Sequence, residues 1–107
     1  MSFVLPEVTE ESFDRDVLAS EIPVLLDFTA PWCAPCRALT PILEAVAVET
    51  AGKLRVASVD GDISPKIAAR FGVKSFPTLL LFDKGLVVAK HVGLTTRARI
   101  LEMTTIR

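Results

Sequence analysis

Both cysteines of the chain lie in one short segment, APWCAPC at residues 30–36, where two residues separate Cys33 from Cys36. Two thiols at this spacing could form a structural cross-link, supply half of a metal site, or act as a reversible two-electron redox switch. A disulfide between them closes such a short loop that the chain-entropy model gives it only about 2 kcal/mol of stabilisation. A structural cross-link would span a longer loop, so the spacing favours the redox switch.

A metal site is the weaker interpretation. Structural zinc needs four ligands, and the two cysteines with the single histidine, His91, provide at most three. His91 lies between Lys90 and Val92 in an alternating segment, a pattern typical of an ordinary surface residue. An iron–sulfur cluster shared by two chains remains open, because two such cysteine pairs would supply four thiolates. We expect no metal ligands and no cofactor beyond the Cys33–Cys36 pair.

The cysteines are predicted to lie between a strand and a helix. The run PVLLDFTA at 23–30 is nearly continuous and apolar, which is typical of a strand buried on both faces. After the cysteines, apolar residues from Leu39 onward follow helical spacing until Gly52. We place Cys33 at the N-cap and Cys36 at position N3, so that a thiolate on Cys33 can accept the unpaired N–H of Cys36. The positive end of the helix dipole adds to this effect, and the pKa of Cys33 should fall below its usual ~8.5.

The two thiols are therefore expected to differ in role. We expect Cys33 to be an exposed nucleophile, and Cys36 to face inward as the less acidic, resolving thiol. Pro35 lies in the first turn, where it stiffens the loop without removing a donor that the helix needs. Residues three apart on one helical turn can bring their side chains together, so an intrachain disulfide is available. This arrangement predicts dithiol–disulfide exchange.

The remaining sequence alternates between strand and helix patterns. Helices are predicted from an N-cap at Thr9 to about Ser20, from Ser64 and Pro65 to Gly72, and from a cap at Thr95 to about Thr105. Strands are predicted at 2–5, 53–60, 78–83 and 86–92, with a hairpin turn at DKG between the last two. The resulting order, β-α-β-α-β-α-β-β-α, predicts an α/β fold with a central mixed β-sheet and helices on both faces.

Bulk composition limits the partners. A chain of 107 residues that is 50% hydrophobic is expected to form one globular domain over residues 1–107. Its net charge of −1 gives no reason to expect nucleic acid or an anionic membrane as a partner. No apolar run approaches the ~20 residues of a membrane span, and the N-terminal segment lacks the basic start of a secretory signal. We expect a cytoplasmic monomer, in a compartment where lasting structural disulfides are unusual.

An ordered set of motifs resembles the thioredoxin family over about residues 3–107. The set consists of LDFTAPWCAPC, Pro41, FGVKSFPTLLLF, DKG and HVG. Two cysteines in C-x-x-C spacing beside a βαβ pattern are a known signature of this family. The resemblance implies a thioredoxin fold and a protein disulfide reductase that exchanges with protein substrates. It also implies a separate disulfide reductase as the electron donor.

The resemblance assigns roles to individual residues. It makes Cys33 the attacking thiol, Cys36 the resolving thiol and Asp27 the buried carboxylate beneath Cys36. It places a cis peptide bond before Pro77, beside the cysteines. The remaining implied residues contact substrate or tune the cysteine loop; the contacts are Trp32, Ser75, Phe76, Pro77 and Gly93, and the loop residues are Ala34 and Pro35.

Three positions depart from the family's usual pattern. Ala34 replaces the glycine between the cysteines, Thr29 replaces an aromatic residue, and Ser58 replaces a strand lysine found in many relatives. These changes affect the expected redox potential and the partner enzyme more than the fold. Two other functions remain open: a non-catalytic or metal-binding subunit with the same fold, and an oxidase or isomerase.

Overall fold

The computed structural model describes residues 5–105 of the chain. Its strands are β1 (Val24–Thr29), β2 (Arg55–Asp60), β3 (Thr78–Asp83) and β4 (Leu86–Val92). Its helical elements are the π-helix η1 (Asp14–Leu18), α1 (Ala34–Glu49), α2 (Pro65–Arg70) and α3 (Arg97–Met103). Among these described helices, none is both long and apolar enough to span a membrane.

The sheet is mixed, as the sequence predicts. Its strand order is β2-β1-β3-β4, with β1 parallel to β2 and antiparallel to β3, and with β3 antiparallel to β4. The two-residue turn between β3 and β4 has Lys84 at φ 52° and Gly85 at φ 81°. Two successive positive φ values match the twist of a tight hairpin and explain the glycine. The hairpin predicted at DKG is confirmed.

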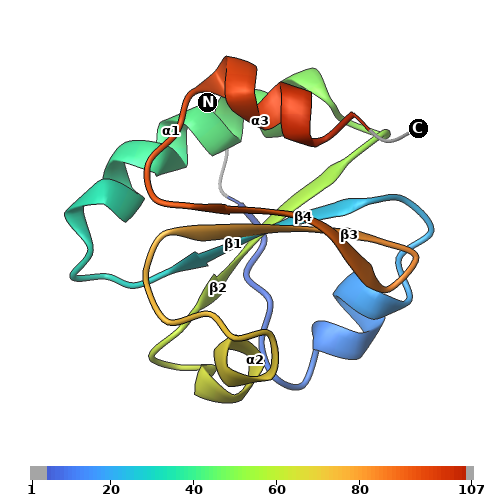
Figure 1. Cartoon of the computed structure of the whole chain (residues 1–107). Helices are drawn as coiled ribbons and strands as arrows, with labels where there is room; N and C mark the ends of the chain where they lie inside the picture. The colour runs from blue at the N-terminus through green and yellow to red at the C-terminus, as the bar shows by residue number, and fades with distance from the viewer. Residues whose placement is uncertain (1–4, 106–107) are drawn as a thin grey trace.

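Helices cover both faces of the sheet. Figure 1 shows α1 and α3 on one side, and α2 with the blue N-terminal helical segment on the other. Successive residues of β1 point to opposite faces: Leu25 packs in the cluster that includes α1 and α3, whereas Leu26 packs in the cluster that includes η1 and α2. The predicted strand buried on both faces is therefore confirmed, and so is the predicted α/β fold with a central mixed sheet and helices on both faces.

The N-terminal part of the chain differs from the prediction. Residues 2–4 of the expected first strand lie outside the described residues. The pairing seen in the structure comes from the next residues, where Ser58 donates to the carbonyl of Pro6 (2.9 Å) and Val8 donates to the carbonyl of Ser58 (2.7 Å). Within residues 5–105 this pairing amounts to an isolated parallel bridge between Glu7 and Ser58.

Two predicted helix starts need correction. Thr9 accepts a hydrogen bond from the backbone of Ser12 (3.2 Å), but it opens a turn, and the regular part of this segment is the π-helix η1. The last helix is capped by Thr96, whose hydroxyl accepts from the N–H of Arg99 (3.2 Å), and not by Thr95. Both threonines are good caps, so only the backbone path decides between them.

The long helix α1 has the cap that the sequence predicts and ends slightly earlier. Cys33 is its N-cap, Cys36 occupies N3, and the helix stops at Glu49 rather than at Gly52. Pro41 lies inside it and removes one backbone donor, yet the helix continues. The apolar stripe along α1 packs on the sheet and fixes the helix start above the end of β1.

The packing of α1 gives a direct test. Leu43 is fully buried in the cluster shared with Leu25, whereas Val48 lies on the exposed side of the same helix. Leu43→Ala should lower the free energy of unfolding by about 2–5 kcal/mol, because it leaves a cavity. Val48→Ala should change it by less than about 0.5 kcal/mol. Chemical denaturation measures both, and equal losses would contradict the assigned faces.

Candidate active site

The topology gathers four loop regions at one edge of the sheet. The carboxyl ends of the parallel strands β1 and β2 lie together, with Thr29 opposite Asp60. Because β3 runs the other way, its first residue, Thr78, lies opposite Phe28 at the same edge. Since β4 is antiparallel to β3, its last residue, Val92, pairs with Thr78. The cysteine loop, the loop after β2, the segment before β3 and the segment after β4 therefore meet at this edge.

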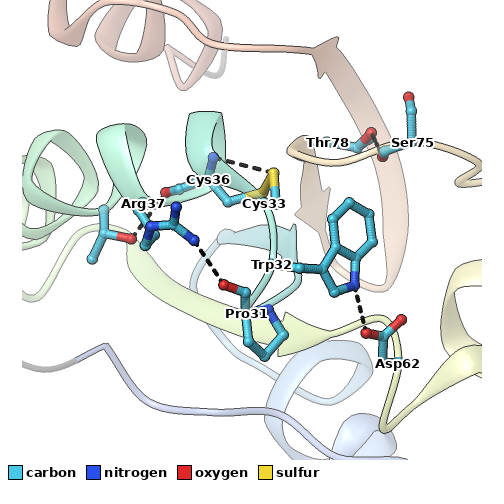
Figure 2. The surroundings of a disulfide bond; sticks show 9 residues. Pro31, Trp32, Cys33, Cys36, Arg37, Asp62, Ser75 and Thr78 are labelled. Atoms are coloured by element: carbon cyan, nitrogen blue, oxygen red, sulfur yellow. Dashed lines mark hydrogen bonds between the residues drawn. A yellow bond between two sulfur atoms is a disulfide. The ribbon is translucent and has the colours of Figure 1, made fainter.

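The two cysteines form a disulfide at the start of α1. Their Cα atoms are 5.2 Å apart. The backbone N–H of Cys36 donates to the sulfur of Cys33 at 3.2 Å, as Figure 2 shows. The sulfur thus takes the place of the oxygen of an ordinary N-cap side chain. This is the hydrogen bond that the positions of the two cysteines predict.

The exposure of the cysteines differs from the prediction. Cys33 was expected to be exposed, but only 4% of its surface is accessible in the disulfide form, against 1% for Cys36. The expectation of an exposed Cys33 is therefore wrong in this form. Its sulfur is bonded to that of Cys36, and both cysteines pack in a small cluster with Ala30 and Phe76.

The residues between and beside the cysteines are accessible. Ala34 and Pro35 occupy the first two positions of α1 and are exposed. Arg37 donates from its guanidinium to the carbonyl of Pro31 at 2.8 Å and so ties the first turn back to the preceding loop (Figure 2). The start of α1 is thus held by the protein on one side and open to solvent on the other.

Asp27 is the one ionisable side chain buried in β1. Its exposed fraction is 2%, and its Oδ1 atom has no hydrogen-bond partner among the described residues. By strand alternation Asp27 points to the same face as Leu25, which is the face that α1 covers. Burial removes the carboxylate from water and raises the pKa of Asp27 to about 7.

Ser58 is the register partner of Asp27 on the neighbouring strand β2. Residues directly opposite in adjacent strands share a face, so the half-buried Ser58 lies beside Asp27. A hydroxyl carries no charge and therefore does not offset the desolvation of the carboxylate. With serine at position 58, Asp27 has no cation opposite it on β2.

Trp32 is held in place although it is largely exposed. Its exposed fraction is 66%, and its indole N–H donates to a carboxylate oxygen of Asp62 at 2.7 Å. Figure 2 shows the ring extending from the cysteine loop toward Asp62 in the loop after β2. The ring centroid of Phe76 lies 5.9 Å from that of Trp32, at an interplanar angle of 58°. An aromatic pair therefore stands next to the disulfide.

The segment before β3 lies against the segment after β4. The peptide bond between Phe76 and Pro77 is cis, as the resemblance implied. The hydroxyl of Thr78 donates to the carbonyl of Ser75 at 2.7 Å, and the N–H of Gly93 donates to the carbonyl of Pro77 at 2.8 Å. These two bonds hold the segment before β3 against the segment after β4; Ser75 is exposed, Phe76 and Gly93 are half-buried, and Pro77, which was expected to contact substrate, is buried.

Sequence reasoning missed the loop after β2. Asp60 Oδ1 accepts from the N–H of Asp62 (2.8 Å) and of Ile63 (3.3 Å), and Asp62 in turn holds Trp32. The letters DGD, with an aspartate that can accept from its own backbone two residues later, are a turn signal that could have marked this loop. Nothing in the letters relates the loop to Trp32.

Two further features are not part of the site described above. His91 is half-buried rather than a surface residue, because it lies opposite Leu79 on the face covered by α1 and α3; its Nε2 is buried without a partner among the described residues. Within residues 5–105, no three His, Cys, Asp or Glu side chains gather to hold a metal ion. A cavity of about 510 Å³ lies at the far end of α1; it is lined by Pro23, Thr50, Lys53, Leu54, Leu101, Thr104 and Thr105.

Comparison with known proteins gives consistent matches over the chain. A sequence model of the thioredoxin family matches residues 4–105. The chain is 42% identical over 100 residues to thioredoxin C-2 of Corynebacterium nephridii, and this alignment covers 94% of the chain and 93% of that protein. It is 43% identical over 100 residues to a thioredoxin of Synechocystis sp., with 91% and 94% covered. It is 41% identical over 99 residues to thioredoxin 1 of Nostoc sp., with 90% and 92% covered.

A mixed sheet of this topology, with a disulfide capping the first long helix, defines a thiol–disulfide oxidoreductase. The matches identify its kind: the chain belongs to the thioredoxin family. It is a protein disulfide reductase that works by dithiol–disulfide exchange, and its redox-active group is the disulfide of Cys33 and Cys36.

The raised pKa of Asp27 predicts how stability depends on pH. Since the pKa is about 7 in the fold and near 3.8 in an unfolded chain, the folded state binds the extra proton between these values. Stability should therefore fall as pH rises from about 4 to about 7 and then level off. Asp27→Asn removes this dependence and should be more stable above pH 7, by on the order of 4 kcal/mol. Denaturation curves across this range measure the difference, and parallel pH profiles would contradict it.

Ser58 allows a second test of the same carboxyl group. Ser58→Lys places a cation on the face and in the register of Asp27, so it should lower the pKa of Asp27. Ser58→Met is the matched control, because it adds a similar chain without a charge. Carboxyl NMR titration of the disulfide form reads the pKa directly. A wild-type Asp27 that titrates near ~3.9, like a surface aspartate, would show that burial does not act as described.

Proposed function

We propose that Cys33 attacks the substrate disulfide and that Cys36 resolves the mixed disulfide. The observation that carries this assignment is the 3.2 Å hydrogen bond from the N–H of Cys36 to the sulfur of Cys33. In the reduced protein the same donor, together with the positive end of α1, stabilises a thiolate on Cys33. Cys36 is the more deeply buried of the two and sits one turn further along the helix.

The proposed cycle balances in atoms and electrons. The Cys33 thiolate bonds to one substrate sulfur, the substrate S–S bond breaks, and the other sulfur leaves as a thiolate that takes a proton. Cys36 then loses its proton and attacks the sulfur of Cys33, which releases the second substrate sulfur. Two electrons pass from the two thiols of the chain to the substrate. A separate disulfide reductase then returns two electrons and two protons to Cys33 and Cys36.

Asp27 is proposed as the group that receives the proton of Cys36. Three features support this role: the carboxyl group is buried, it lies on the face that α1 covers, and its pKa is about 7. A base with a pKa near the working pH can both accept and return a proton. Asp27 therefore acts in the second step and not in the attack by Cys33.

Protein substrates are proposed to bind across Trp32, Ser75, Phe76, Pro77 and Gly93. Within residues 5–105, the backbone N–H and C=O of Phe76 have no hydrogen-bond partner. An extended substrate segment can pair with these groups as an added strand, which places its disulfide next to Cys33. Ala34 and Pro35, at the exposed first turn, are proposed to tune the redox potential of the loop.

The setting of the protein belongs to the same proposal. We propose that residues 1–107 form a single domain that acts as a cytoplasmic monomer, passes electrons between proteins, and uses no metal or other cofactor. Both cysteines are used by the redox pair, so the chain has none left for a lasting structural disulfide. Its balanced charge supports protein partners over nucleic acid or membrane.

Cysteine variants test the assigned order of steps. Reduction of a disulfide-containing test protein by dithiothreitol should be accelerated by the wild type and not by Cys33→Ser, since the attacking thiolate is gone. Cys36→Ser should still attack but stop at the mixed disulfide, which mass spectrometry detects as a covalent adduct. The double variant Cys33→Ser/Cys36→Ser is the control and should give no adduct. An adduct with Cys33→Ser but not with Cys36→Ser would reverse the roles.

A further inference from the structure

Gly61, in the loop after β2, is unlike the other four glycines of the chain. Those four have φ values between 69° and 95°, where the backbone itself favours glycine. Gly61 is not among the positive-φ residues, so its backbone is open to any residue. Space is what forbids a side chain there. A Cβ at Gly61 would lie 2.7 Å from one ring carbon of Phe76 and closer still to a second.

The ring of Phe76 thus occupies the place of the side chain that Gly61 lacks. From this seat it packs against the cluster of Ala30, Cys33 and Cys36. Its other neighbour is Trp32, whose ring centroid lies 5.9 Å away. The position of Phe76 beside the disulfide therefore depends on the absence of a side chain at residue 61.

The same loop also holds the second aromatic ring. Asp62 accepts the indole N–H of Trp32, and Asp60 fixes the loop by accepting two of its backbone N–H groups. Residues 60–63 therefore position both rings: Asp62 holds Trp32 by a hydrogen bond, and the missing side chain at Gly61 leaves room for the ring of Phe76. Ile63, the last residue of the loop, is 66% exposed.

Large apolar side chains are also exposed at the end of β4 and just after it. Val92 and Leu94 are both exposed and flank Gly93, which is hydrogen-bonded to Pro77. Trp32 and Ile63 are exposed as well, so each of the loops after β1, β2 and β4 that meet at this edge of the sheet carries a large exposed apolar side chain. An acidic substrate side chain placed here would lose water and meet the carboxylate of Asp62, whereas an apolar one would bury surface against the rings.

We propose that the loop of residues 60–63 is a specificity-determining element, and that Gly61 is a positioning residue within it. By seating the ring of Phe76 next to Trp32, it builds an aromatic wall that accepts an apolar side chain adjacent to the substrate cysteine. The preferred substrates are then protein disulfides flanked by residues such as Leu or Phe. This inference rests on the proposed function, because it specifies which disulfides react with Cys33.

The dependence of Phe76 on Gly61 is tested by a double-mutant cycle. Gly61→Ala should lower the denaturation midpoint, because the added Cβ meets the Phe76 ring. In the Phe76→Ala background the same substitution should leave the midpoint unchanged, since the ring is absent. Non-additivity of this kind is expected only for residues in contact. Equal losses in both backgrounds would overturn the seating of Phe76 by Gly61.

Substrate preference is tested with two disulfide peptides that differ only in the residue before one cysteine, Leu or Ser. The wild type, with dithiothreitol as reductant, should prefer the Leu peptide in kcat/KM by about tenfold, mostly through KM. Both Phe76→Ala and Gly61→Ala should reduce this ratio to about twofold or less. The ratio is taken within each variant, so a general loss of activity does not affect it.

Phe71→Ala is the matched control. Phe71 is also partly buried and packs against the same large cluster as Phe76, but its aromatic neighbours are Phe13 and Phe82 rather than Trp32. This variant should lose stability and keep the wild-type preference, which separates a specific effect from general destabilisation. Trp32 is the only tryptophan, so its fluorescence can also report binding of the two peptides with serine in place of cysteine. The Leu peptide should bind the wild type more tightly, and Phe76→Ala should lose this difference.

The outcomes distinguish failure of the inference from failure of the proposed function. If the wild type reduces bis(2-hydroxyethyl) disulfide and both peptides but Phe76→Ala and Gly61→Ala keep the full preference, the inference is overturned and the proposed function stands. If the wild type accelerates none of these reactions, the proposed function fails and the inference fails with it. A preference that disappears in Phe71→Ala as well would also overturn the inference, because it would reflect stability alone.

Discussion

The burial of β1 on both faces is the constraint on which the rest of the structure depends. Its residues Val24–Thr29 lie between β2 and β3, and each face is covered by a separate apolar cluster. A strand covered in this way has no freedom to shift by one residue, because a shift would exchange the side chains of the two clusters. Its carboxyl end is therefore fixed in space, and so is the cysteine loop that follows. The first turn of α1 inherits this position, which places the amide of Cys36 at the sulfur of Cys33.

Asp27 is the one ionisable residue of that strand, and burying its carboxyl group lowers the stability of the fold. An apolar residue at this position beneath α1 would make the folded protein more stable. The carboxyl group of Asp27 is desolvated there, and its Oδ1 atom lacks a partner among the described residues. The same desolvation brings its pKa to about 7, which a surface aspartate cannot reach. The position that lowers the stability of the fold is thus also the one where the structure places a carboxyl group that titrates near neutral pH, as the proposed proton transfer requires. Ser58 leaves this effect without a compensating cation.

The sequence predicted most of what depends on local patterns. The apolar run of β1, the caps at Cys33 and the hairpin at Lys84 and Gly85 each follow from neighbouring residues, and all three are confirmed. The errors are also local: two adjacent threonines compete as caps, and a turn at Thr9 leads into a π-helix. The prediction that Cys33 is exposed was wrong, because the accessibility of Cys33 depends on the disulfide and on packing against Phe76, a residue 43 positions away.

The sequence could not predict how separate loops meet at the edge of the sheet that carries the disulfide. The contact of Trp32 with Asp62, and that of Gly61 with Phe76, join residues brought together only by the order and direction of the strands. A glycine in a DGD turn has an ordinary explanation in the letters, namely a flexible backbone. The φ of Gly61 removes this explanation, and the ring of Phe76 replaces it with a steric one. The redox cysteines and the buried carboxyl group of Asp27 could therefore be found from the sequence, whereas the contacts of Trp32 with Asp62 and of Gly61 with Phe76 could be found only from the structure.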